Sequence, residues 1–195
     1  MTDQPAPPQD ARHFLLTRRS VPLRTLATPA PDRHALAELL TAAARVPDHG
    51  KLEPWRFVVL ERPALERLAA AAAAQGPALG IEPDRIAKGQ GQFAESPLAV
   101  AVIAAPRESP VIPPVEQVLS AGAVCLSLLN AALAAGWGAS WLTGWVAHDR
   151  RFAEPAFGLG PQEWVAGIVH IGTRTAPPPE RPRPDIGAIT TWVSE

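Results

Sequence analysis

One uncharged segment, Val118–Leu142, restricts most strongly what this chain can fold into. It is longer than the roughly 20 apolar residues that a helix needs to span a bilayer. Polar residues interrupt it, however, and Gly136 and Gly138 should end a helix before the segment itself ends. No basic cluster flanks it to orient a membrane segment. We therefore expect a helix over about 115–135 that is buried on all sides in a protein core, without membrane contact.

Size and charge exclude several other classes. The 195 residues suit one domain, which can bury about 70% of the surface of the unfolded chain. The 18 basic and 19 acidic side chains nearly cancel, which argues against a nucleic-acid partner. The only cysteine, Cys125, lies in the uncharged segment and cannot form a disulfide within the chain. Residues 1–10 lack the basic region and apolar core of a signal peptide. We expect them to be a disordered arm of a cytoplasmic protein, followed by a single domain over 11–195.

A polar turn forms a second constraint, between an alanine-rich helix and a strand. Pro47 should end the helix, because proline disfavours the helical conformation in the residue before it. Gly50 can adopt positive φ in the polar loop that follows, and Trp55–Leu60 is typical of a strand entering a core. Such a loop between rigid elements is a common position for binding residues. A capped helix-to-strand turn without a ligand explains the same pattern.

Two arginines and a serine, Arg18-Arg19-Ser20, stand at the end of the first predicted helix. Guanidinium groups offer planar, charged donors, so this helix end could hold a phosphate. Arg45, in the last turn of the second predicted helix, could face the same anion. The alternative is that these cations only complement the dipole of their helix.

The rest of the chain predicts helices and strands without βαβ repeats. Gly89-x-Gly91 and Gly136-x-Gly138 lack the third glycine of a dinucleotide-binding fingerprint, which argues against a Rossmann site. The residues after 173 are proline-rich and basic, and we interpret them as an arm lying across a neighbouring subunit. The expected helices cover residues 10–19, 33–45, 63–75, 84–93, 115–135 and 149–157, and the expected strands cover 55–60, 98–105, 138–144 and 164–172.

Patterns for hydrolysis or metal binding are absent from the sequence. It contains no Gly-x-Ser-x-Gly elbow, and its five histidines are scattered without metal-ligand spacing. His170 lies in an otherwise apolar strand, and we interpret it as a core histidine. An organic cofactor, which the protein need only bind, orient and tune, is the remaining route to catalysis.

Three motifs in order give the chain a family resemblance. They are Arg18-Arg19-Ser20, Pro47-Asp48-His49 followed by Pro54-Trp55, and Trp141-Leu142-Thr143-Gly144. From Phe14 to Val193 the chain resembles the FMN-dependent nitroreductases, in particular their small NAD(P)H nitroreductase subgroup. The resemblance implies an α+β fold, with a central and mainly antiparallel sheet flanked by helices. It also implies an intertwined homodimer with FMN at the subunit interface, and a C-terminal arm over 173–195. The uncharged helix around 115–135 fits such a large, core-like interface better than the interior of a monomer of this length.

The resemblance also assigns contacts to FMN, which itself carries the chemistry, so that no side chain is expected to act as a nucleophile. The arginine-serine motif would hold the phosphate and the pyrimidine side, and the basic tail would add phosphate contacts. The Pro-Asp-His turn would pack along the flavin, and the Trp-Leu-Thr-Gly strand end would lie along its dimethylbenzene and N5 edge. The candidate cofactor-binding residues are Arg18, Arg19, Ser20, Arg45, Pro47, Asp48, His49, Lys51, Trp141, Leu142, Thr143, Gly144, Arg181 and Arg183.

The chain departs from the family pattern at three positions. Many family members have a lysine or arginine two residues after the serine, where this chain has Pro22. Lys51 and Glu53 replace an asparagine and a glutamine that are usual before the Pro-Trp pair. As a hypothesis, Arg45 or Lys51 supplies the positive charge that Pro22 cannot supply.

The leading functional hypothesis is an NAD(P)H-dependent FMN oxidoreductase. It would take a hydride from NADH or NADPH through flavin N5 and reduce nitroaromatics, quinones or similar conjugated small molecules by a ping-pong mechanism. Residues 76–92 and 106–114 would shape the acceptor pocket. One alternative is a non-catalytic protein that stores or senses FMN. Another is a helical interaction protein whose proline-rich arms recruit partners.

Overall fold

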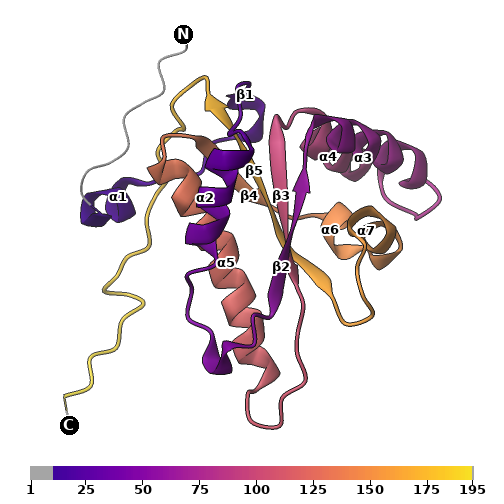
Figure 1. The fold of residues 1–195 in the computed structure, drawn as a ribbon. Helices are drawn as coiled ribbons and strands as arrows, with labels where there is room; N and C mark the ends of the chain where they lie inside the picture. The colour runs from indigo at the N-terminus through magenta and orange to yellow at the C-terminus, as the bar shows by residue number, and fades with distance from the viewer. Residues whose placement is uncertain (1–10, 195) are drawn as a thin grey trace.

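The computed structural model describes residues 11–194, which form one five-stranded sheet with helices on both faces (Figure 1). Every strand pair is antiparallel, as the family resemblance implied. The strands follow the order β1-β5-β3-β2, and β4 also pairs with β5. The strands are β1 Leu26–Ala27, β2 Trp55–Leu60, β3 Leu98–Ala104, β4 Gly138–Leu142 and β5 Trp164–Arg174. The helices are α1 Ala11–Thr17, α2 Arg33–Ala43, α3 Arg62–Gln75, α4 Pro83–Ala94, α5 Pro114–Ala134, α6 Trp145–His148 and α7 Arg150–Phe157, with short 3-10 turns η1 Leu23–Thr25 and η2 His49–Lys51.

Local sequence signals explain most element boundaries. The Asp32 side chain accepts a hydrogen bond from the Ala35 N–H at 2.8 Å, which fixes the start of α2. Asp149 caps α7 in the same way, and Gly158, at φ 62°, ends that helix. The arm predicted for residues 1–10 and the last residue, Glu195, lie outside the described residues.

One predicted strand is too long, and one short helix was missed. β4 ends at Leu142, not at Gly144, because Gly144 adopts φ 127° and turns the chain out of the extended conformation. α6 then starts at Trp145, whose indole packs edge-on against Phe152 with ring centroids 4.9 Å apart. β5 also continues to Arg174, so the C-terminal arm leaves the sheet later than expected.

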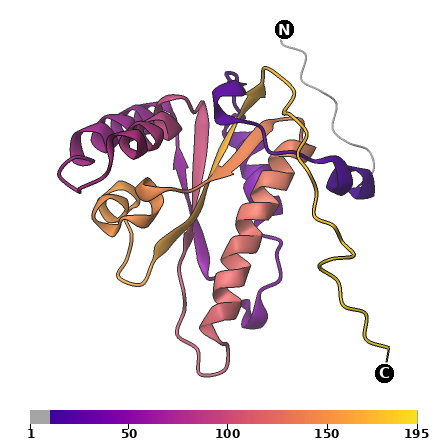
Figure 2. The same ribbon diagram turned by 180° about the vertical axis from the view of Figure 1, so that it is seen from behind.

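The two faces of the sheet are covered differently. On one face, α3, α4, α6 and α7 enclose a core that includes Phe93, Trp145 and Phe152. On the other face, α5 packs against α2 and the sheet through residues such as Val124 and Leu128. This second layer is only one helix pair thick, and Figure 2 shows α5 without another helix on its outer side.

The prediction that the long helix is buried on all sides is wrong for the single chain. By length and composition α5 could cross a membrane, but one of its faces is packed as a core helix. Its opposite face leaves Val115, Val118, Leu119 and Leu126 exposed, with Leu119 at 67%. Apolar residues at this spacing occupy one side of a helix, so α5 presents an uncovered apolar stripe.

The C-terminal arm starts beside the first segment of the chain. Thr173 and Thr175 donate backbone hydrogen bonds to the carbonyls of Pro29 and Thr25, at 3.1 and 2.9 Å. These bonds hold the start of the arm next to η1, residues 179–184 lie against the segment that follows α1, and the chain beyond them extends away from the body (Figure 2). Its apolar side chains are exposed, Trp192 at 88%.

Candidate functional site

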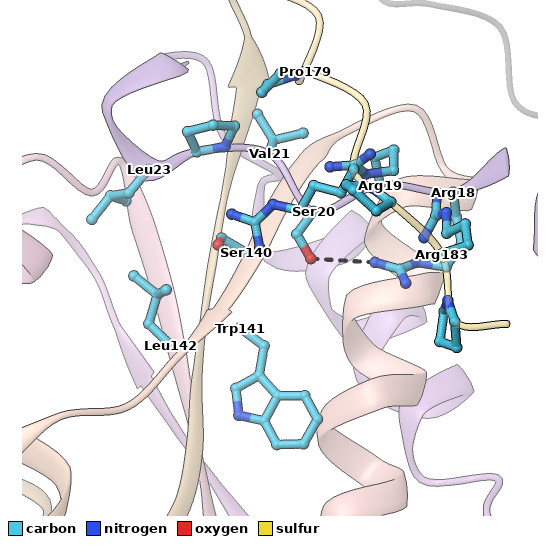
Figure 3. A pocket seen from close by; sticks show the side chains of 14 residues that line it. Arg18, Arg19, Ser20, Val21, Leu23, Ser140, Trp141, Leu142, Pro179 and Arg183 are labelled. Atoms are coloured by element: carbon cyan, nitrogen blue, oxygen red, sulfur yellow. Dashed lines mark hydrogen bonds between the residues drawn. The ribbon is translucent and has the colours of Figure 1, made fainter. Parts of the chain in front are cut away.

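A cavity of about 500 Å³ lies where residues 18–23, the end of β4 and the C-terminal arm meet (Figure 3). Its size falls within the range of small-molecule and cofactor sites. Seven of the predicted site residues line it, together with others that the sequence did not single out. The lining consists of Arg18, Arg19, Ser20, Val21, Pro22 and Leu23, of Ser140, Trp141 and Leu142, and of Pro179, Arg181, Pro182, Arg183 and Pro184.

Backbone hydrogen bonds bring these distant segments together. The Val21 N–H donates to the Ala139 carbonyl at 2.9 Å, which attaches the arginine-serine motif to β4. The bond from Thr175 to Thr25 attaches the arm to the same segment. Four arginines from opposite ends of the chain therefore line one cavity.

The cavity contains more positive than negative charge. Glu180, on the arm, lies 2.6 Å from Arg19 and 3.3 Å from Arg183, and it is the carboxylate paired with this cluster. Arg18 donates to the Ser20 hydroxyl at 3.2 Å, but its buried Nε atom has no acceptor among residues 11–194. Burial lowers the pKa of Arg18, and the nearby Arg183 and Arg19 lower it further. A guanidinium with an unsatisfied buried donor among other cations suits an anion such as a phosphate.

The end of β4 offers a flat surface and a free backbone donor next to the cavity. The Trp141 indole lies against Gly167, where even a Cβ atom would collide with the ring. Thr143 and Gly144 follow Leu142 directly but do not line the cavity themselves. The Gly144 N–H donates to no acceptor within residues 11–194. The arginine cluster and this strand end therefore place several anion donors and one free backbone donor in the same region.

The polar turn lies elsewhere in the same chain. Ser120 donates to the Pro47 carbonyl at 2.9 Å, and His49 Nδ1 lies 2.7 Å from a Glu116 carboxylate oxygen. Both contacts are with the first turns of α5, whereas residues 18–23, which line the cavity, lie near the other end of that helix (Figure 1). Seven of the predicted residues therefore do not line the cavity of their own chain: Thr143 and Gly144, which directly follow its lining, and Arg45, Pro47, Asp48, His49 and Lys51 in and before the turn.

The turn has an unusual backbone. Gly50 adopts φ 73°, as expected, but Lys51 and Glu53 also have positive φ, at 53° and 48°. The Asp48 side chain supports this shape by accepting a hydrogen bond from the Glu53 N–H at 2.8 Å. Arg45, just before the turn, is exposed.

Two residues near the cavity were not predicted. Glu180 neutralises part of the arginine cluster, and Gln92, on α4, donates to the Thr143 carbonyl at 2.7 Å. No local pattern marks Gln92, because its contact depends on how α4 docks against a segment 51 residues away. Gln92 also lines a second cavity of about 590 Å³, which shares Leu23 and Leu142 with the first.

The two segments expected to shape an acceptor pocket lie apart. The end of the 76–92 segment lines that second cavity, next to the arginine cluster. Residues 106–114 line a separate cavity of about 840 Å³ beside Trp164.

Other reactive groups are buried away from this site. His170 is fully buried as predicted, with Nδ1 3.0 Å from the Ser96 hydroxyl, and burial lowers its pKa to about 3. Burial raises the pKa of the Cys125 thiol to about 12. Within the described part of the chain, no three His, Cys, Asp or Glu residues group as metal ligands.

Comparisons with known proteins identify the family of this chain. The model of the nitroreductase family matches residues 15–173. The Escherichia coli (strain K12) protein YdjA, named as an NAD(P)H nitroreductase, is 34% identical over 164 residues, which cover 84% of this chain and 88% of YdjA.

Solved structures show the same fold. The nitroreductase-like family protein from Bacillus cereus superposes with a TM-score of 0.74 at 23% identity, over 95% of this chain and 97% of that one. A Desulfovibrio desulfuricans protein named as a nitroreductase, solved in complex with FMN, gives a TM-score of 0.74 at 19% identity, over 96% and 99% of the two chains. With the family model and the sequence relative, these comparisons establish that the chain belongs to the nitroreductase family.

Proposed function

We propose that this oxidoreductase of the nitroreductase family binds FMN in the arginine-lined cavity and uses NAD(P)H to reduce small conjugated acceptors. The observation that carries the proposal is the unsatisfied, buried Nε of Arg18 among four arginines, next to a strand end with a free N–H. The names of the relatives support it, since one is an NAD(P)H nitroreductase and one structure contains FMN. We also place the protein in the cytoplasm, where NADH and NADPH are available.

The phosphate of FMN would be held by the arginine cluster. Arg18, Arg181 and Arg183 would donate to it together with the Ser20 hydroxyl. A hydrogen bond to a charged group contributes roughly 1.5–3 kcal/mol, so several of them would retain the cofactor without a covalent bond.

The flavin ring would lie along the end of β4. When bound, FMN supplies the transfer of hydride from NAD(P)H and onward to a nitroaromatic, quinone or similar acceptor. The chain contributes position: Trp141 and Leu142 give an apolar surface, and the Gly144 N–H is a fixed donor. Holding the reactants in a reactive geometry is itself a large part of catalysis.

The polar turn would complete the site from a second copy of the chain. The apolar stripe of α5 is exposed, as are Leu15 and Leu16 on α1 and the apolar side chains of the arm. A homodimer would cover these surfaces, and obligate homodimer interfaces are large and core-like. We therefore infer that the turn of one copy, with Pro47, Asp48 and His49, packs against the flavin in the cavity of the other, and that the arm lies across the neighbouring subunit.

A positive charge near the pyrimidine would come from the same turn. Pro22 lines the cavity and carries no charge, so Arg45 or Lys51 of the second copy would take this part. Replacing Arg45 with alanine should then weaken FMN binding or shift the flavin reduction potential. Unchanged values for both would remove Arg45 from this role.

The absorption spectrum of the purified protein is the first test. We expect a yellow protein with flavin bands, one FMN per chain, and a dimeric mass by sedimentation. Anaerobic titration with NADH and NADPH should bleach the bands, and adding a quinone or nitroaromatic should restore them.

Each alternative has its own outcome. Bound FMN without NAD(P)H consumption in the presence of an acceptor would identify a storage or sensor protein. A protein that stays colourless when FMN is added would contradict the proposal and favour a helical interaction protein.

A further inference from the structure

One side chain outside the cavity controls the backbone at its edge. Gln92 Nε2 donates to the Thr143 carbonyl at 2.7 Å. The carbonyl can only accept, so this contact fixes which end of the Gln92 amide faces it. The Thr143–Gly144 peptide is therefore held from the side of α4.

The helix that carries Gln92 is itself firmly docked. The Trp145 indole N–H donates to the Arg85 carbonyl of α4 at 2.8 Å. Gly89 packs so closely on Trp145 that a Cβ atom there would collide with the indole. Because Trp145 directly follows Gly144, α4 holds the Thr143–Gly144 peptide through both Gln92 and Trp145.

Gly144 cannot hold this peptide in place by itself. It adopts φ 127° and ψ −170°, a conformation that is essentially restricted to glycine, which has the widest conformational freedom of any residue. In a trans peptide the N–H points away from the C=O. With the Thr143 carbonyl bound by Gln92, the Gly144 N–H points away from that amide, and it has no acceptor among residues 11–194.

The remaining atom of the Gln92 amide is also unusual. Its Oε1 is buried and has no donor within the described residues. A buried acceptor without a partner costs free energy. This cost is not explained by a role of Gln92 in the fold alone. Gln92 also lines the cavity that shares Leu23 and Leu142 with the arginine-lined one, so its amide lies at a ligand-sized space.

We propose that Gln92 is a positioning residue, which aims the Gly144 N–H at the reactive edge of the flavin. This inference rests on the proposed function, in which the end of β4 meets that edge. Oxidised flavin has a hydrogen-bond acceptor, N5, at this edge, whereas reduced flavin has an N–H there. An N–H donor aimed at this edge therefore favours the oxidised form. By holding that donor in place, Gln92 makes the protein bind oxidised FMN more tightly than it otherwise would, relative to reduced FMN.

The test replaces Gln92 and measures binding of each redox form separately. Gln92→Met keeps the length of the side chain and removes the donor, and Gln92→Leu removes the donor with a shorter, uncharged side chain. Both variants should weaken the binding of oxidised FMN by about threefold to tenfold, the loss expected for one hydrogen bond. The binding of reduced FMN, measured anaerobically, should weaken less, so the potential of the bound flavin should rise.

A matched control and a clear contrary result complete the experiment. Gln90, on the same helix, is exposed and makes no side-chain hydrogen bond to any residue of the described part of the chain, so Gln90→Met should leave both affinities and the potential unchanged. Equal weakening of both redox forms, with an unchanged potential, would show that Gln92 only supports the fold and would overturn the inference. Unchanged binding in both variants would overturn it too. Failure of the wild-type protein to bind FMN would instead count against the proposed function itself.

Discussion

The two ends of α5 differ in how complete they are within one chain. At the C-terminal end, three separate segments converge on a cavity with four arginines. At the N-terminal end, Ser120 and Glu116 contact the polar turn, yet none of the turn residues lines the cavity of its own chain. The apolar stripe that joins the two ends is exposed. The comparison teaches that one end of the helix carries most of the lining of a site, while the other carries predicted site residues that this cavity does not use within one chain.

The largest effect should come from placing a charge on the stripe between the two ends. Leu119→Asp would bury an unpaired carboxylate in the inferred dimer interface, at a cost of about 3–5 kcal/mol. We expect monomers by sedimentation and loss of bound FMN. Ala70→Asp, at an exposed position of α3 on the opposite layer, is the matched control and should leave the dimer intact. A Leu119→Asp protein that remained dimeric and yellow would break the comparison.

Removing a positive charge from the arginine-lined cavity, near the C-terminal end of α5, should have the next largest effect. Arg18→Ala should weaken FMN binding about tenfold to hundredfold, the equivalent of roughly 1.5–3 kcal/mol for hydrogen bonds to a charged group. Equilibrium titration of FMN fluorescence measures this change. Arg24→Ala removes an exposed arginine from the same segment, outside the cavity lining, and should bind FMN like the wild type.

Mixing two defective chains sharpens the comparison further. In a heterodimer of Arg18→Ala and His49→Ala chains, one site would combine both defects, and the other would combine an intact cavity with an intact turn. We expect such heterodimers, isolated with two different affinity tags, to regain about one tightly bound FMN per dimer. If each site instead used the turn of its own chain, both sites of the heterodimer would stay defective and no binding would be regained.

The smallest effect concerns the carboxylate beside the arginines. Glu180 pairs with Arg19 and Arg183, and hydrogen bonds from the Arg181 N–H and from Arg19 lower its pKa. Glu180→Gln removes the negative charge that competes with the phosphate, while its amide oxygen can still accept from Arg19. Because Glu180 is exposed, we expect FMN binding to tighten by less than about fivefold, and the gain to shrink at high salt. Weaker binding would mean that Glu180 mainly holds the arginines in place.

Local chemistry made most of the fold predictable. Asp32 and Asp149 cap the helices predicted over 33–45 and 149–157, and the strand over 55–60 has the predicted bounds. α6 was missed because no local pattern shows that the chain turns at Gly144. The turn lies beside a contact between α4 and Thr143, which comes from the tertiary fold. The sequence left open whether the apolar α5 lies inside one chain or at a subunit interface, because helices in the two positions have the same composition.

The site was predictable in its residue types but not in its grouping. Arg18, Arg181 and Arg183 were singled out by charge and by resemblance, and the cavity brings them together. That the turn with His49 lies at the far end of α5 depends on the tertiary fold, which the spacing of the motifs does not reveal. Gln92 and Glu180 act through contacts between segments far apart in the sequence, so no motif contains them.

The left-handed backbone of Lys51 and Glu53 has a consequence for how two copies would meet. The left-handed conformation costs roughly 1–2 kcal/mol of free energy per residue, and the single chain already adopts it without a partner. A loop shaped in advance gives up little further conformational freedom on contact, so association need not wait for it to fold. Encounter between copies would then be selective for shape from the outset, and a mismatched neighbour would find a surface that does not adapt to it.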